Sequence, residues 1–215
     1  LHPVAHSFPT RRSSDLNGLE HMEQTEKIVL EGYLSVRALL NGGNRKAEKI
    51  LINAKKKKGK KALRIIELAG KKNVTVEFAS HGIIETLTSG STHGGFAAVC
   101  GPREYCPLDD LCNDPDGFVV MLDGVEDPFS FGNSIRAMYA AGVTGLVIRG
   151  REWHRAAGII ARSSAGTSEL IPTARAETPG EAAGFFRDRG FRIRATSRGD
   201  NAHSIYEIDW NGPVF

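Results

Sequence analysis

The stretch LDGVEDPFSFGNSIRAMYAAGVTGLVIRG, residues 122–150, carries the alternation that decides the fold. Its first residues complete an apolar run over 117–125, which is typical of a strand buried on both faces of a mainly parallel sheet. A helix predicted over 134–142 ends at Gly142, and a second apolar run over 145–150 predicts the next strand. This order of strand, helix and strand predicts an open parallel sheet covered by helices on both faces.

The same alternation continues toward the end of the chain. Helices are predicted over 153–166 and 180–190, a third strand over 191–197, and the start of a further strand over 212–215. In open α/β sheets, ligands bind at the carboxyl ends of the strands. The loop over 123–133 is therefore expected to border a site.

Asn133 and Arg136 follow that loop. They are three residues apart, so they are expected to share a helix face near the helix N-terminus, where the backbone favours anions. The alternative is structural, with Asn133 as a helix cap and Arg136 in a surface ion pair with Glu126 or Asp127. The pattern alone supports the ligand-binding and structural interpretations equally.

The N-terminal half predicts a separate, compact α/β unit that ends near Arg103. Apolar residues at near-helical spacing, beginning with Ile28 and Val29, predict a helix within 26–43 that stops at Gly42 and Gly43. Strands are predicted over 48–53, 73–79 and 94–101, and helices over 58–72 and 81–88. The prolines and acids of residues 104–116 predict a linker.

A lysine-rich run, KKKKGKK, occupies Lys55–Lys61 between a predicted strand and a predicted helix. Such a run is commonly a solvated loop and helix start. At the edge of a small sheet it can also bind phosphates electrostatically, and Lys56, Lys57, Lys58 and Lys60 are the candidates for RNA contact. Gly94–Gly95 serves either a tight turn or a close approach of backbone to ligand.

Composition sets wider limits. The 215 residues are 40% hydrophobic with a formal net charge of +3, enough for one large domain or two small ones, and mildly basic. No apolar stretch is long enough to span a bilayer, so no membrane partner is expected. The three cysteines, Cys100, Cys106 and Cys112, are predicted to be free thiols. No metal site is expected, and most of the scattered histidines are interpreted as solvated.

The first residues, LHPVAHSFPTRRSSDL, show no apolar periodicity, and SFPTRRSSDL resembles the translation of a sequencing adapter. Residues 1–21 are therefore interpreted as a non-native or disordered leader, with Met22 as the native start. The alternative is a basic arm that touches RNA. The predicted organisation is then a first domain over 22–103, a linker over 104–116 and a second domain over 117–215.

The pattern DGVxDPxxxGNxxRxxxxxG, the strand directly after it, and SAGxSE in the next helix and turn closely resemble the SpoU/TrmH family of RNA 2′-O-ribose methyltransferases. The resemblance implies a parallel-sheet α/β-knot methyltransferase domain over 117–215. It also implies a small α/β, ribosomal-protein-like RNA substrate-binding domain over 22–103.

Several expectations follow from this resemblance. The cofactor would be S-adenosylmethionine, the substrate rRNA or tRNA, the assembly a homodimer and the location cytoplasmic. Arg136 would be catalytic, with Asn133 positioning the ribose or phosphate. Ser163, Gly166, Ser168 and Glu169 would line the RNA side of the site, their alternative being a helix end and a capped turn. Thr196 and Ser197 would approach the cofactor, or be ordinary turn residues.

One departure from the family is large. The family continues beyond the strand that GPVF begins with a loop bearing glycine and glutamate, and then with a Ser-Leu-Asn-Val-Ser segment; this sequence ends at Phe215. The chain is therefore interpreted as a C-terminally incomplete fragment that is inactive by itself. Two alternatives stay open: a non-catalytic RNA-binding α/β module, and an unrelated nucleotide-binding α/β protein, which would usually carry a glycine-rich phosphate loop.

Overall fold

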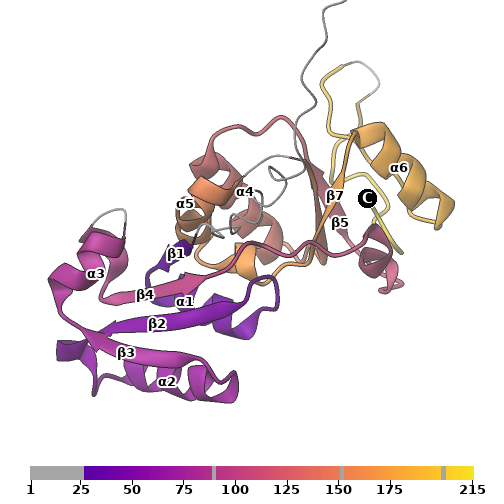
Figure 1. Cartoon of the computed structure of the whole chain (residues 1–215). Coiled ribbons are helices and arrows are strands. Elements are labelled where there is room, and N and C mark those ends of the chain that lie inside the picture. Colours follow the sequence, from indigo (N-terminus) through magenta and orange to yellow (C-terminus); the bar gives the residue numbers. More distant parts are fainter. Residues whose placement is uncertain (1–26, 89–90, 151–152, 200–201) are drawn as a thin grey trace, which may run out of the picture.

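The computed structural model describes residues 27–88, 91–150, 153–199 and 202–215, so the predicted leader over 1–21 lies outside the described residues. The chain forms two sheets; helix α5 lies beside strand β1 of the first, and α4 packs against α5 (Figure 1). Within the described ranges no helix is long and apolar enough to span a bilayer.

The first sheet has four strands in the order β1-β4-β2-β3. Strands β2 and β3 are parallel, whereas β4 is antiparallel to both β1 and β2. The predicted strands and the two later helices are confirmed. The elements of this unit are β1 (Ile28–Glu31), α1 (Tyr33–Asn41), β2 (Ala47–Asn53), a 3₁₀ turn (Ala54–Lys56), α2 (Lys60–Lys71), β3 (Thr75–Ala79), α3 (His81–Leu87), a 3₁₀ turn (Ser91–His93) and β4 (Phe96–Cys100).

The helix predicted within 26–43 was wrong at its start. Ile28 and Val29 belong to β1, and the helix begins only at Tyr33. Gly32 separates the two elements at φ 90°, and its N–H donates to the carbonyl of Phe96 at 2.9 Å. This pairing with β4 is long-range, and glycine is the residue that adopts positive φ without strain. Local spacing therefore merged a strand with the helix that follows it.

The second sheet is parallel, with the order β5-β6-β7. Strand β7 was missed from the sequence, because its alternating small and polar residues give only a weak strand signal. The elements of this unit are a 3₁₀ turn (Leu108–Cys112), β5 (Val119–Leu122), α4 (Pro128–Ala140), β6 (Gly145–Arg149), a 3₁₀ turn (His154–Ala156), α5 (Ala157–Ser163), a 3₁₀ turn (Thr167–Glu169), β7 (Thr173–Ala176) and α6 (Pro179–Asp188).

The strands predicted over 191–197 and 212–215 are present only as single parallel bridges. Val214 pairs with Phe118 on one side and with Arg192 on the other. The segment at Val214 therefore lies beside the start of β5, and the segment at Arg192 lies beyond it, where two further parallel strands would extend the sheet. Neither segment forms a regular strand.

Residues 104–116 are packed rather than loose. Leu111 is buried against the core of the second sheet, and the N–H of Cys106 donates to the carbonyl of Thr173 at 3.0 Å. The cysteines are free thiols, as predicted. Burial raises the pKa of the Cys100 thiol to about 12, because desolvation disfavours the thiolate.

Helix α5 joins the two halves of the chain. Its residues Ala157 and Ala161 belong to the same buried cluster as Leu30 of β1 and Val36 of α1. A Cβ on Gly158 would come within 2.8 Å of the carbonyl oxygen of Val29, so the helix approaches β1 closely. The core of the first sheet is therefore completed by a helix that the sequence assigned to the second domain.

Candidate functional site

A groove of about 1030 Å³ lies between the first sheet and helices α4 and α5. Arg136 of α4 reaches it from one side, and the lysine-rich run at the start of α2 reaches it from the other. These elements are more than sixty residues apart in sequence. The residues that line the groove include Tyr33, Lys55, Lys56, Lys58, Lys60, Lys61, Thr92, His93, Gly94, Phe96, Arg136 and Arg162.

The groove is strongly basic. Five lysines and two arginines line it, and Glu31 is its one acidic residue among those described. Glu31 is buried and forms an ion pair with Arg162 at 2.5 Å. The other cations are therefore not neutralised by acids in the groove wall, which makes the groove suited to a polyanion.

Two lysines have local roles. Lys56 Nζ donates to the carbonyl of Gly94 at 2.6 Å, and Lys61 Nζ lies 5.2 Å from the centre of the Tyr33 ring. Lys57, one of the predicted RNA contacts, does not line the groove: its Nζ lies 4.7 Å from the centre of the Phe78 ring. Lys56, Lys58 and Lys60 are at the groove, as an RNA contact requires.

Arg136 is exposed and is the ninth residue of α4. The helix begins six residues earlier than predicted, so the expectation that Arg136 lies near its N-terminus is wrong. The ion pair given as the structural alternative is also not formed: within the described part of the chain, Arg136 has no carboxylate partner. Asp127 instead caps the helix, accepting from the N–H of Ser130 at 2.7 Å, and this hydrogen bond lowers its pKa.

Asn133 lies one turn before Arg136 and is exposed. Because Asp127 is the cap, the alternative interpretation of Asn133 as a helix cap is wrong. Asn133 is not among the residues that line the groove. Its positioning role stays a prediction.

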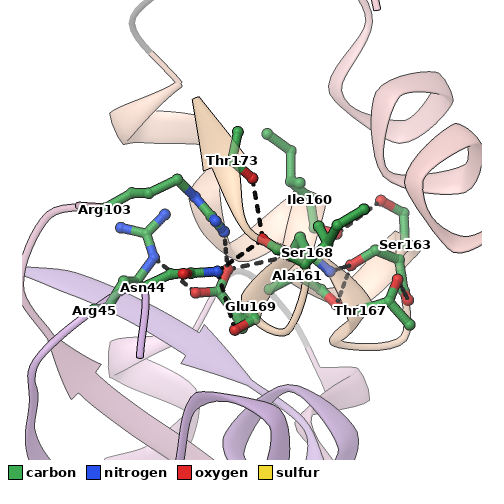
Figure 2. A network of polar contacts seen from close by, with 12 residues as sticks. Asn44, Arg45, Arg103, Ile160, Ala161, Ser163, Thr167, Ser168, Glu169 and Thr173 are labelled. Atoms are coloured by element: carbon green, nitrogen blue, oxygen red, sulfur yellow. Dashed lines mark hydrogen bonds and ion pairs between the residues drawn. The ribbon is translucent and has the colours of Figure 1, made fainter. Parts of the chain in front are cut away.

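Ser168 and Glu169 of the SAGxSE region form, with Arg45 and Arg103, a polar anchor between the two halves (Figure 2). Glu169 is 1% exposed and is held by Arg45 at 3.0 Å and by Arg103 at 2.7 Å. Ser168 is also buried and donates to Glu169 at 3.1 Å. In this arrangement neither Ser168 nor Glu169 is available for direct RNA contact, contrary to the expectation for this region.

Ser163 and Gly166 also serve packing. Ser163 Oγ donates to the carbonyl of Ile159 at 2.9 Å and lies against Gly132, where a Cβ would come within 1.9 Å of it. Gly166 has φ 86°, and a Cβ there would come within 2.7 Å of the carbonyl oxygen of Leu34. The close approach of these helices therefore depends on glycine. The turn after a helix end, given as the alternative, describes this region well.

Two smaller cavities lie near the second sheet. One of about 350 Å³ is lined by Asp123–Glu126 and by the ends of β5 and β6, so the predicted loop does border a cavity at the carboxyl ends of the strands. The other, of about 250 Å³, lies beside the Glu169 anchor and is walled by the stacked rings of Phe131 and Trp153. Thr196 and Ser197 are exposed and line none of these three cavities.

Sequence reasoning missed Tyr33 and Arg162 at the groove, and Arg45 and Arg103 at the anchor. Arg162 stands two residues before the start of SAGxSE at Ser164, so its position was a usable signal. Arg45 and Arg103 lie in a loop and after a strand, and nothing local distinguishes them from solvated arginines.

Two family models match the chain. The model of the SpoU rRNA Methylase family matches residues 117–215, and the model of RNA 2′-O ribose methyltransferase substrate binding matches residues 29–106. A TrmH family tRNA/rRNA methyltransferase of Staphylococcus saprophyticus is 30% identical over 194 residues, which is 88% of this chain and 76% of that protein. The TrmH family protein YacO of Bacillus subtilis is 31% identical over 161 residues, covering 71% of this chain and 63% of YacO.

Solved structures show the same fold. An rRNA methyltransferase from Sinorhizobium meliloti aligns with a TM-score of 0.69 at 23% identity, over 93% of this chain and 73% of that one. The SpoU methyltransferase AviRb from Streptomyces viridochromogenes, in complex with AdoMet, aligns with a TM-score of 0.66 at 18% identity, over 87% of this chain and 71% of AviRb.

Proposed function

This chain belongs to the SpoU/TrmH family of RNA methyltransferases, and we propose that its protein transfers a methyl group from S-adenosylmethionine to a ribose 2′-OH of rRNA or tRNA. The match of residues 29–106 to a 2′-O-ribose substrate-binding model supports the ribose as the acceptor. The AdoMet named for AviRb supports the methyl donor. Homodimer formation and a cytoplasmic location stay predictions.

One observation carries the proposal: Arg136 and the lysine-rich run line the same groove. A methylating enzyme must bind the RNA backbone close to its catalytic group, because the reacting oxygen belongs to that backbone. Lysines at Lys58 and Lys60 bind phosphates as point charges, and Arg136 presents two parallel N–H donors. RNA held by the lysines therefore passes Arg136.

Arg136 cannot act as a simple base, because a guanidinium stays protonated at biological pH. Its charge and fork-shaped donors can stabilise the 2′-alkoxide as the proton leaves. Two routes for the proton remain compatible with this role. A neighbouring RNA phosphate accepts it while Arg136 holds both oxygens, or Arg136 lowers the pKa of the 2′-OH enough for water to accept it.

The site for the methyl donor differs from the basic groove. S-adenosylmethionine would supply the methyl group, but Thr196 and Ser197 are exposed and enclose no cavity among those described above. The residues that the structure describes around Thr196 and Ser197 do not form a pocket that fits the cofactor. The roles proposed for this chain's own residues are therefore RNA binding and stabilisation of the reacting oxygen.

The proposal is tested by mapping 2′-O-methyl positions in rRNA and tRNA from a strain that lacks the gene. We expect one or a few positions to lose methylation. A plasmid carrying the intact gene should restore them, and the Arg136→Ala version should not.

An unchanged methylation map would contradict the enzymatic function. If the protein still bound those RNAs with strong salt dependence, the alternative of a non-catalytic RNA-binding module would replace it. The map also decides between rRNA and tRNA as substrate.

A further inference from the structure

Three potential metal ligands lie together where α3 meets the 3₁₀ turn that precedes β4. His81 and Glu85 are four residues apart on α3, so they share one helix face. His93 comes from the 3₁₀ turn that precedes β4. One ligand atom from each of the three residues lies within 4.8 Å of the other two. The rings of His81 and His93 have their centres 4.8 Å apart.

His93 is the unusual member of this cluster, because its side chain is polar and yet 0% exposed. Its Nδ1 accepts from the N–H of Gly95 at 3.0 Å. Its Nε2 is buried and has no hydrogen-bond partner in the described part of the chain. Leaving a buried polar atom unsatisfied costs about 1 to 3 kcal/mol, so such an atom calls for an explanation.

We propose that His81, Glu85 and His93 form a binding site for a divalent transition metal of the zinc class. Two imidazoles and one carboxylate are a ligand set that zinc uses, whereas magnesium and calcium prefer oxygen ligands alone. The metal would bind Nε2 of His93 and so satisfy the atom that the protein leaves without a partner. Three protein ligands leave a fourth tetrahedral position for water.

The three ligand atoms must move closer together to bind one ion. Zinc bonds to nitrogen and oxygen are about 2.0 to 2.2 Å long, so ligand atoms around a tetrahedral ion lie about 3.3 to 3.6 Å apart. The side chains of His81 and Glu85 are exposed and already 3.7 Å apart at Nε2 and Oε1, so they can move toward the buried His93.

Metal binding at Nε2 changes which nitrogen of the His93 ring carries the proton. With Nδ1 accepting from Gly95, the neutral His93 ring carries its proton on Nε2. The metal takes the place of that proton, and Nδ1 gains one from solvent, so the ring stays neutral. The N–H of Gly95 then loses its acceptor. This loss is a local cost of about one hydrogen bond.

The site borders the basic groove without depending on it. Thr92, His93 and Gly94 form part of the groove wall, and Arg162 donates to Thr92 Oγ1 at 2.5 Å. A metal that ties α3 to this turn would fix that wall in place. Metal binding at these three residues therefore does not depend on whether the protein methylates RNA.

The test is a titration of the chelator-treated protein with ZnCl₂. Calorimetry measures the binding, and thermal melting measures the effect of zinc on stability. We expect one saturable site and a higher Tm in zinc. His81→Ala and Glu85→Gln, both at exposed positions that should leave folding intact, should each weaken binding at least tenfold, since loss of even an indirect partner costs about 10- to 100-fold. Cobalt should give the absorption bands of a tetrahedral ion.

His203→Ala is the matched control, because His203 is exposed and lies outside the cluster. It should leave zinc affinity unchanged. Absence of saturable binding would overturn the proposal. So would equal affinity in the wild type, His81→Ala and Glu85→Gln, or an equal loss in His203→Ala.

Discussion

The anchor around Glu169 and the groove around Arg136 both gather basic residues, but they treat the charge in opposite ways. At the anchor, the side chains of Arg45 and Arg103 are 5% and 11% exposed and share one carboxylate. In the groove the lysines and Arg136 are solvated, and the one acid of the wall among the described residues is already paired with Arg162. A buried charge must be neutralised inside the protein, whereas a solvated charge is stabilised by water and remains available to a ligand. The anchor is therefore structural and the groove is the candidate for binding.

The largest effect is expected from breaking the anchor. Glu169→Ala leaves two buried guanidinium groups without their carboxylate, and loss of one partner of a buried pair costs about 3 to 5 kcal/mol. The free energy of unfolding, from urea denaturation, should fall by that amount. Glu67→Ala is the matched control, because Glu67 also binds two basic residues, Arg64 and Lys71, but on the surface. Equal stability losses in the two variants would contradict the distinction drawn here.

Arg136 should show the reverse behaviour, with loss of activity and intact stability. Loss of one well-placed transition-state donor typically lowers the rate about 10²- to 10³-fold, and we expect this of Arg136→Ala in single-turnover methylation by the full-length gene product. Arg136→Lys should fail almost as badly, because lysine keeps the charge but lacks the planar fork.

Thermal melting and RNA affinity serve as controls for both Arg136 variants. Because the side chain is exposed, we expect neither the melting temperature nor folding to change. Near wild-type turnover in Arg136→Ala would remove Arg136 from the mechanism. Recovery of activity in Arg136→Lys would show that charge matters rather than geometry.

The packing of the turn at Gly166 against helix α1 can also be tested. Ala at this position requires a left-handed backbone and a Cβ within 2.7 Å of the Leu34 carbonyl oxygen, so we expect Gly166→Ala to destabilise the protein by about 2 to 4 kcal/mol. Gly70→Ala in α2 is the control, because a Cβ there has nothing within 4 Å. This variant should be as stable as the wild type or up to about 1 kcal/mol more stable. Urea denaturation of both variants makes the measurement.

The smallest effect sharpens the groove itself. The salt dependence of RNA binding reports how many phosphates the lysines contact. Replacing Lys58 and Lys60 by Gln should reduce the slope of log K against log salt by about 1.4 to 1.8, at roughly 0.7 to 0.9 for each lost contact. Replacing Lys57 and Lys72, which do not line the groove, should leave the slope unchanged. Equal slopes in the two double variants would show that the lysine-rich run is only a solvated loop and helix start.

Most elements could be predicted from the sequence, because their signals are local. Apolar runs, capping glycines and helical spacing located β2 to β6 and helices α2 to α6. The failures have non-local causes. Gly32 ends a strand because Phe96 pairs with it, and β7 is recognisable as a strand only beside β6. The start of α4 was misplaced by six residues, although the Asp-Pro pair at Asp127 was a usable cap signal.

The candidate site divides in the same way. By itself the sequence determined the family motif, the presence of Arg136 and the six lysines between Lys55 and Lys61, because identity and spacing are written along the chain. Only the tertiary structure decided that Arg136 and these lysines share a groove, that Glu169 is buried, and that His81 meets His93. Those outcomes depend on which distant segments pack together, and packing is set by the summed burial of many residues rather than by any single stretch.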